Sequence, residues 1–168
     1  MIAGIFRAGA LLLAFVFAAA PLRAEEPSGC DKFKWDIALP QAALATPAKI
    51  PVSDGGALDL GVGALARLSP VDKVRFPQAP ERAPKPESFG AVLTLAAPPA
   101  GTYTVSLSAG AWIDVIQNGA PLKPEAFSGA RDCPHIRKSL KFKLQSALTT
   151  LQISNAAEPE IGIVVLGE

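Results

Sequence analysis

GTYTVSLSAGAWIDVIQNG, residues 101–119, decides the fold class. In its first half, Tyr, Val and Leu alternate with Thr and Ser, which is the period of two of a half-buried β-strand. A second apolar run follows Gly110 and ends at Asn118 and Gly119, a pair that supplies the positive φ angles of a tight hairpin turn. The stretch therefore predicts two consecutive strands followed by a hairpin.

The same pattern extends over the C-terminal half of the chain. Strands are predicted at residues 89–97, 139–145, 148–154 and 161–166, with Gly and Pro residues between them. Short strands about ten residues apart, joined by such turns, are typical of an antiparallel β-sandwich or jelly roll. Because the last run is apolar on both faces, it should be a central strand or lie against a partner.

The N-terminal half has fewer signals for strands. IALPQAALA, residues 37–45, predicts a short helix, and residues 57–70 predict one or two strands interrupted by glycines. Residues 77–88 contain four prolines, which exclude a helix or a central strand. We expect this Pro-rich segment to be extended and to run over the surface of the sandwich.

Residues 1–24 have the layout of a secretory signal peptide, with Ala24 as the last residue removed. The apolar run of this segment covers residues 8–20. A membrane-spanning helix needs about 20 apolar residues, so the run is too short to span a membrane. We expect one β-sandwich domain over residues 25–168, periplasmic or extracellular, with no transmembrane segment. A competing possibility is a lipoprotein modified at Cys30, although a proline precedes the small residues there.

The charge of the precursor comes partly from the signal peptide. Of the 16 basic residues, Arg7 and Arg23 lie within it, which leaves 14 basic against 15 acidic residues. This balance argues against nucleic acid as a partner.

The two cysteines, Cys30 and Cys133, should form a disulfide in an oxidising compartment. The alternative is a metal site of these cysteines with His135, the one histidine of the chain. Because a structural zinc site takes four ligands, no metal and no cofactor are expected.

His135 also raises the alternative of a small hydrolase or metal-dependent enzyme. Its partners in a catalytic triad would be Asp132 and either Ser128 or Ser139, and such partners converge in space rather than in sequence. Ser128 does not lie in a G-x-S-x-G motif, so the sequence gives this alternative little support.

A basic run is the first candidate for ligand binding. Arg131, Arg137 and Lys138, followed by Lys141 and Lys143, would suit an anionic ligand. The alternative is a solvated strand face, in which outward lysines protect an edge strand from pairing with other chains.

Trp112 and Asp114 are the second candidate, and two arrangements stay open. If Ile113 and Val115 face the core, the Trp and the Asp point outward together, as in a sugar-binding platform. If Trp112 and Ile116 are core, Asp114 must be hydrogen-bonded inside, for instance to loop amides. The second arrangement is favoured.

Residues 101–119, with a Gly-x-Tyr strand followed by a strand that carries a buried aliphatic run and an Asp, resemble the bacterial pre-peptidase C-terminal type of β-sandwich. The closing NAAEPEIGIVVLG resembles the last strand of such domains. The Cys-Asp-Lys-Phe-x-Trp start and the later Arg-Asp-Cys-Pro are similar to small exported proteins of alphaproteobacteria. The resemblance implies a β-sandwich.

These observations together predict an exported, non-enzymatic binding or envelope accessory protein. Its partner would be a glycan, another envelope component or an anionic ligand. A further alternative is an interaction subunit that uses residues 161–166 or the Pro-rich segment.

Overall fold

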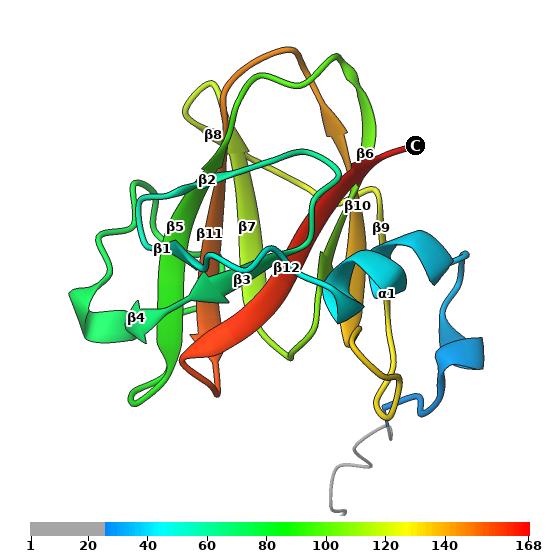
Figure 1. The fold of residues 1–168 in the computed structure, drawn as a ribbon. Coiled ribbons are helices and arrows are strands. Elements are labelled where there is room, and N and C mark those ends of the chain that lie inside the picture. The colour runs from blue at the N-terminus through cyan, green and yellow to red at the C-terminus, as the bar shows by residue number, and fades with distance from the viewer. Residues whose placement is uncertain (1–25) are drawn as a thin grey trace, which may run out of the picture.

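Two β-sheets packed face to face form the protein, and one short helix lies against the outside of the first sheet (Figure 1). The computed structural model describes residues 26–168, so the predicted signal peptide lies outside the described residues. The β-sandwich expected from the strand pattern is confirmed. Most strand pairs are antiparallel, and the pairs β1–β3 and β2–β5 are parallel.

The strands of each sheet come from both halves of the chain. In spatial order the first sheet contains β1 (Val52–Ser53), β3 (Ala64–Arg67), β12 (Glu160–Gly167), β6 (Gly101–Leu107), β10 (Lys138–Leu144) and β9 (Ala126–Gly129). The second contains β2 (Ala57–Leu58), β5 (Phe89–Leu95), β11 (Thr149–Ala156), β7 (Trp112–Gln117) and β8 (Ala120–Leu122), with β4 (Ser69–Pro70) paired to the start of β5. The helical segments are α1 (Ala38–Ala45) and two 3₁₀ turns, η1 (Cys30–Lys32) and η2 (Val71–Lys73).

The main core lies between the two sheets. The inward residues of β6 and β10 meet those of β5, β7 and β11, and Phe142, Leu93, Val115 and Ile153 are almost completely buried. Burying a side chain of this size contributes about 1.5–3 kcal/mol. Asn118 and Gly119 have positive φ angles and form the two-residue turn between β7 and β8, as the sequence predicts.

A second, smaller core lies outside the first sheet, where α1 covers β12. Ile37 and Leu44 of the helical segment pack there with Ile136 and Val164. The helix comes so close that a Cβ on Gly63 would lie 2.0 Å from the carbonyl oxygen of Ala43. β12 is thus central in its sheet and buried on both faces, and its outer face is covered by a segment of its own chain.

The Pro-rich segment, residues 77–88, lies across the outer face of the second sheet without forming a strand or a helix. Its backbone N–H groups donate to side chains of β7 and β11. The N–H of Gln78 donates to Gln152 (2.9 Å), and the N–H of Lys85 donates to Asn155 (2.7 Å). The outward polar residues of β11, and Asp114 of β7, therefore accept hydrogen bonds from backbone amides of the covering segment.

β10 is not an edge strand, so the expectation that its lysines protect a sheet edge is wrong. The strand pairs with β6 on one side and with β9 on the other. Lys141 is half-buried, and its ammonium is paired with Glu168. β9, with the sequence AFSG, carries no clear alternation, which is why the sequence does not reveal this neighbour.

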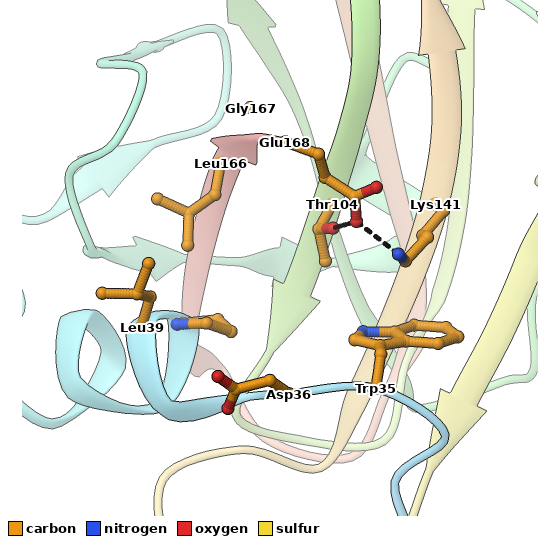
Figure 2. A pocket seen from close by; sticks show the side chains of 9 residues that line it. Trp35, Asp36, Leu39, Thr104, Lys141, Leu166, Gly167 and Glu168 are labelled. Carbon is orange, nitrogen blue, oxygen red and sulfur yellow. Dashed lines mark hydrogen bonds and ion pairs between the residues drawn. The ribbon is translucent and has the colours of Figure 1, made fainter.

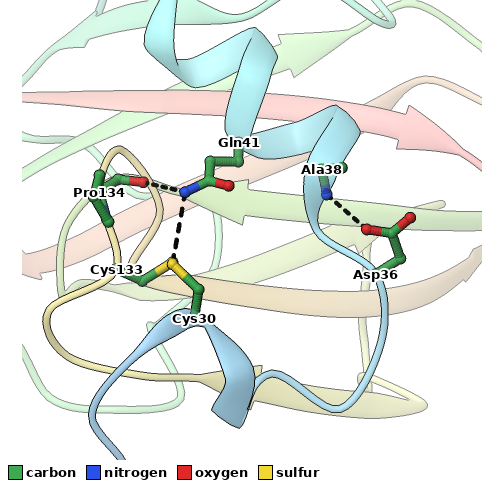
Figure 3. Close-up of a disulfide and its surroundings, with 6 residues drawn as sticks. All are labelled: Cys30, Asp36, Ala38, Gln41, Cys133 and Pro134. Carbon is green, nitrogen blue, oxygen red and sulfur yellow. Dashed lines mark hydrogen bonds between the residues drawn. A yellow bond between two sulfur atoms is a disulfide. The ribbon is translucent and has the colours of Figure 1, made fainter.

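The disulfide between Cys30 and Cys133 is confirmed (Figure 3), and it brings the two Cα atoms within 4.8 Å of each other across a sequence separation of 103. The amide of Gln41, in α1, donates to the carbonyl of Pro134 (2.9 Å) beside the disulfide. Both sulfurs are used in the bond, which leaves neither thiol free to hold a metal or a lipid. Among residues 26–168, no helix has the length and apolar character needed to cross a membrane.

Removing the disulfide should destabilise the fold without changing its core. Because the closed loop is near 100 residues, we expect the double substitution of Cys30 and Cys133 by Ser to lower the free energy of unfolding by about 2–5 kcal/mol. Urea unfolding of the oxidised wild type and of the variant measures this difference. Reductant should shift the wild type to the same midpoint and leave the variant unchanged, whereas equal midpoints for the oxidised wild type and the variant would contradict the prediction.

Candidate functional site

A cleft of about 410 Å³ opens beside the first residues of β7 and β10 and is also lined by the Pro-rich segment. It brings together basic and aromatic side chains from four separate parts of the chain. Its lining includes four cations, two aromatic rings and one carboxylate: Arg82, Lys85, Arg137 and Lys138; Trp112 and Phe127; and Glu26. We call it the basic cleft.

Trp112 is held in the basic cleft by the buried carboxylate of Asp114. The indole N–H donates to one oxygen of Asp114 (2.9 Å), and the other oxygen accepts from the backbone N–H of Glu81 in the Pro-rich segment (3.3 Å). Asp114 is only 7% exposed. One carboxylate therefore fixes both the ring and the segment that covers it.

These contacts combine parts of the two arrangements left open by the sequence. Ile113 and Val115 face the core between the sheets, so Trp112 and Asp114 are on the outer face. They are not a free sugar platform, because the Pro-rich segment covers Asp114 and the guanidinium of Arg82 lies 4.6 Å from the centroid of the indole. The hydrogen bond of Asp114 to a loop amide is the feature expected in the second arrangement.

Lys138 lies between the two aromatic rings. Its ammonium is 5.2 Å from the ring centroid of Trp112 and 5.5 Å from that of Phe127, and it donates to the carbonyl of Ala111 (2.8 Å). Desolvation lowers the pKa of Lys138 to about 8, and repulsion from the guanidinium groups of Arg82 and Arg137 acts in the same direction. Asp114 opposes this shift only in part.

Arg137 has its carboxylate partner within the N-terminal segment. Its guanidinium pairs with Glu26 (2.5 Å), and the carbonyl of Glu26 also accepts from Arg131 (3.5 Å). Hydrogen bonds of Arg131 with Pro27 and Gly29, together with the nearby disulfide, hold the segment in this position. The carboxylate of Glu26 is therefore the acidic group of the cleft lining.

The cleft has more positive than negative charge. In the part of the chain that the structure describes, Arg82, Lys85 and Lys138 form no ion pair with a carboxylate. Three cations that share a small volume repel each other, and burial of one of them increases the cost. The arrangement suits an anionic ligand that would bridge them.

The structure brings together three of the residues predicted from sequence, Trp112, Arg137 and Lys138, and adds others. Arg82 and Lys85 were missed because the Pro-rich segment was expected only to cover the sheet. The signal that could have found them is the spacing of Arg82 and Lys85 in ERAPK. In an extended polyproline-like segment, residues three positions apart lie on the same side.

The residues of the enzymatic alternative are not joined in one site. The side chain of Asp132 accepts from the hydroxyl of Ser28 (2.6 Å), and the hydroxyl of Ser128 accepts from the backbone N–H of Lys34 (2.9 Å). His135 is exposed in a turn with a φ of 63°. Over residues 26–168, no group of three or more His, Cys, Asp or Glu side chains is placed to hold a metal ion.

Comparison of the chain with protein-family models, with curated proteins and with solved structures gives no match.

Replacing Lys138 should show that its charge is costly in the fold. The folded-state pKa, about 8, lies below the ordinary value of 10.5, so between these values the unfolded chain binds more protons and stability rises with pH. We expect Lys138→Met to gain stability relative to wild type at pH 7 and to lose this gain by pH 10. Urea unfolding of both proteins at the two pH values measures the change.

The matched control is Lys143→Met, on the exposed part of the same strand. Its stability relative to wild type should not change over this pH range. A difference between Lys138→Met and wild type that is independent of pH would contradict the prediction.

Proposed function

We propose that the protein is an exported binding protein of the cell envelope, without a catalytic role, and that its basic cleft binds an acidic saccharide through the carboxylate groups of its sugars. The observation that carries the proposal is the group of three cations, Arg82, Lys85 and Lys138, which surround the cleft without a carboxylate partner in the described chain.

The electrostatics of the cleft favour an anion over a neutral ligand. An anion close to Lys138 would offset the repulsion from Arg82 and Arg137 and the desolvation of the ammonium. Guanidinium groups bind planar carboxylates with two parallel hydrogen bonds, which adds geometric specificity to the attraction. The carboxylate of Glu26 on Arg137 is an internal example of the group that the cleft would accept.

The aromatic rings of the cleft support an acidic sugar as the anionic ligand. Phe127 lines the cleft, whose volume is in the range of small-ligand sites, and half of its surface is exposed and open to contact by a ligand. A sugar ring can place its apolar C–H face against such a ring while its carboxylate reaches the cations.

Export is supported by two features. Residues 1–24 have the pattern of a signal peptide, and the disulfide between Cys30 and Cys133 suits an oxidising compartment such as the periplasm. The alternative of a hydrolase centred on His135 has weaker support, because no described contact joins it to Asp132 or Ser128.

Calorimetric titration with tetragalacturonate, a sugar chain with four carboxylates, tests the proposal. We expect saturable binding that weakens as salt is added, and weaker or no binding of the neutral maltotetraose at this cleft. Lys138→Met should lower the affinity for tetragalacturonate about 10- to 100-fold, because it removes a charge-assisted contact of about 1.5–3 kcal/mol.

Lys143→Met is again the matched control and should bind as wild type does. If Lys138→Met and Lys143→Met lost affinity equally, the binding would be a general effect of positive charge and the proposal would be overturned. The same follows if tetragalacturonate does not bind the wild type.

Glu26 should compete with the ligand for Arg137. We expect Glu26→Gln to raise the affinity for tetragalacturonate up to about fivefold, because an exposed ion pair contributes up to about 1 kcal/mol. The same titration measures this gain. Glu125→Gln removes an equal charge from an exposed position outside the cleft lining and should have no such effect, while unchanged affinity in Glu26→Gln would contradict the competition.

A further inference from the structure

A second pocket, of about 360 Å³, lies between the segment that leads into α1 and the outer face of the first sheet. Figure 2 shows its side chains around a hollow, with Trp35 and Lys141 on one side, Leu39 and Leu166 on the other, and Asp36 and Glu168 across from each other. None of these residues lines the basic cleft. We call it the Trp35 pocket.

Trp35 is fixed before any ligand binds. Its indole N–H donates to the hydroxyl of Ser139 (3.3 Å), which is itself hydrogen-bonded to the hydroxyl of Ser106 (2.9 Å). The backbone N–H of the preceding Lys34 donates to Ser128 (2.9 Å), so the segment is also held to the sheet immediately before the ring. The orientation of the indole is therefore set by the fold.

The polar wall of the pocket keeps acceptor oxygens available. One carboxylate oxygen of Glu168 accepts from Lys141 (2.5 Å) and from the hydroxyl of Thr104 (3.0 Å). One oxygen of Asp36 accepts from the backbone N–H of Ala38 (2.9 Å). Within residues 26–168, the second oxygen of each carboxylate forms no hydrogen bond, so each can accept one from a ligand.

The apolar wall of the pocket is partly open to solvent. Leu39 lies on α1 at the rim of the pocket and is 75% exposed, and Leu166 and Pro40 continue the apolar surface beside it. An apolar wall with a few placed polar groups is typical of small-ligand sites.

We propose that the Trp35 pocket is a second binding site, which takes a neutral sugar ring. The ammonium of Lys141 lies over the indole of Trp35, 5.0 Å from the ring centroid. The leucines and the part of the indole that Lys141 leaves uncovered would contact the C–H groups of the sugar ring, and its hydroxyl groups would donate to Asp36 and Glu168 and accept from Lys141. Two carboxylates against one ammonium disfavour an anionic ligand here, in contrast to the basic cleft. The inference depends on the residues of this pocket alone and is independent of the proposed function.

The two tryptophans of the chain allow a direct test, because Trp112→Phe leaves Trp35 as the only indole. Titration of this variant with methyl glucoside, methyl galactoside, methyl mannoside and maltotetraose should give a saturable change in Trp35 fluorescence. For a site of this size that holds one ring, we expect a dissociation constant of about 1 mM. Glu168→Gln in the same background should weaken binding about 10-fold, which corresponds to one hydrogen bond to a charged group.

Two controls keep the experiment specific. Trp35→Phe leaves only Trp112, whose fluorescence should not change with the same neutral sugars, and Lys143→Met in the Trp112→Phe background should bind them normally. Circular dichroism establishes that each variant is folded. No change of Trp35 fluorescence with any of the four sugars up to about 50 mM, where a millimolar site saturates, would overturn the inference. Binding of tetragalacturonate at the basic cleft would be unaffected by that result.

Discussion

The disulfide between Cys30 and Cys133 positions both candidate sites, because it fixes the N-terminal segment on the outside of the sandwich. Four residues before Cys30, Glu26 reaches into the basic cleft, and five residues after it, Trp35 forms one side of the Trp35 pocket. A segment of this length without regular structure would lose much conformational entropy on docking. The covalent link lowers that cost by restricting the unfolded chain.

Both sites lie where a covering segment meets a sheet. The apolar outer face of β12 is covered by α1 with its preceding segment. The polar outer face of β7 and β11 is covered by the Pro-rich segment, which is hydrogen-bonded to it. Asp114 links the cover of the second sheet to the indole of Trp112, so the same hydrogen bonds that satisfy buried amides also order the basic cleft. Asp114 therefore both holds the covering segment on the sheet and orients Trp112 in the basic cleft.

Alternation within a strand predicted much of the fold, because side-chain direction in a strand depends only on the local backbone. The strands around residues 101–119 and the disulfide followed from such local signals and from cysteine usage. The place of β10 beside β9 did not follow, since strand order depends on contacts distant in sequence. For the same reason the sequence placed Lys138 in a basic run, but could not show Arg82 opposite it on the Pro-rich segment.

The basic cleft has a cost for stability that a purely structural surface would avoid. Lys138 is desolvated beside two guanidinium groups, and no described carboxylate is paired with it. The fold can tolerate this charge because the sandwich core and the disulfide supply stability elsewhere. The disulfide and the hydrogen bonds of Arg131 with Pro27 and Gly29 together hold Glu26 near Arg137, where its carboxylate compensates part of the positive charge of the cleft. The covalent part of this anchor persists in an oxidising compartment, the kind of compartment expected from the signal peptide pattern.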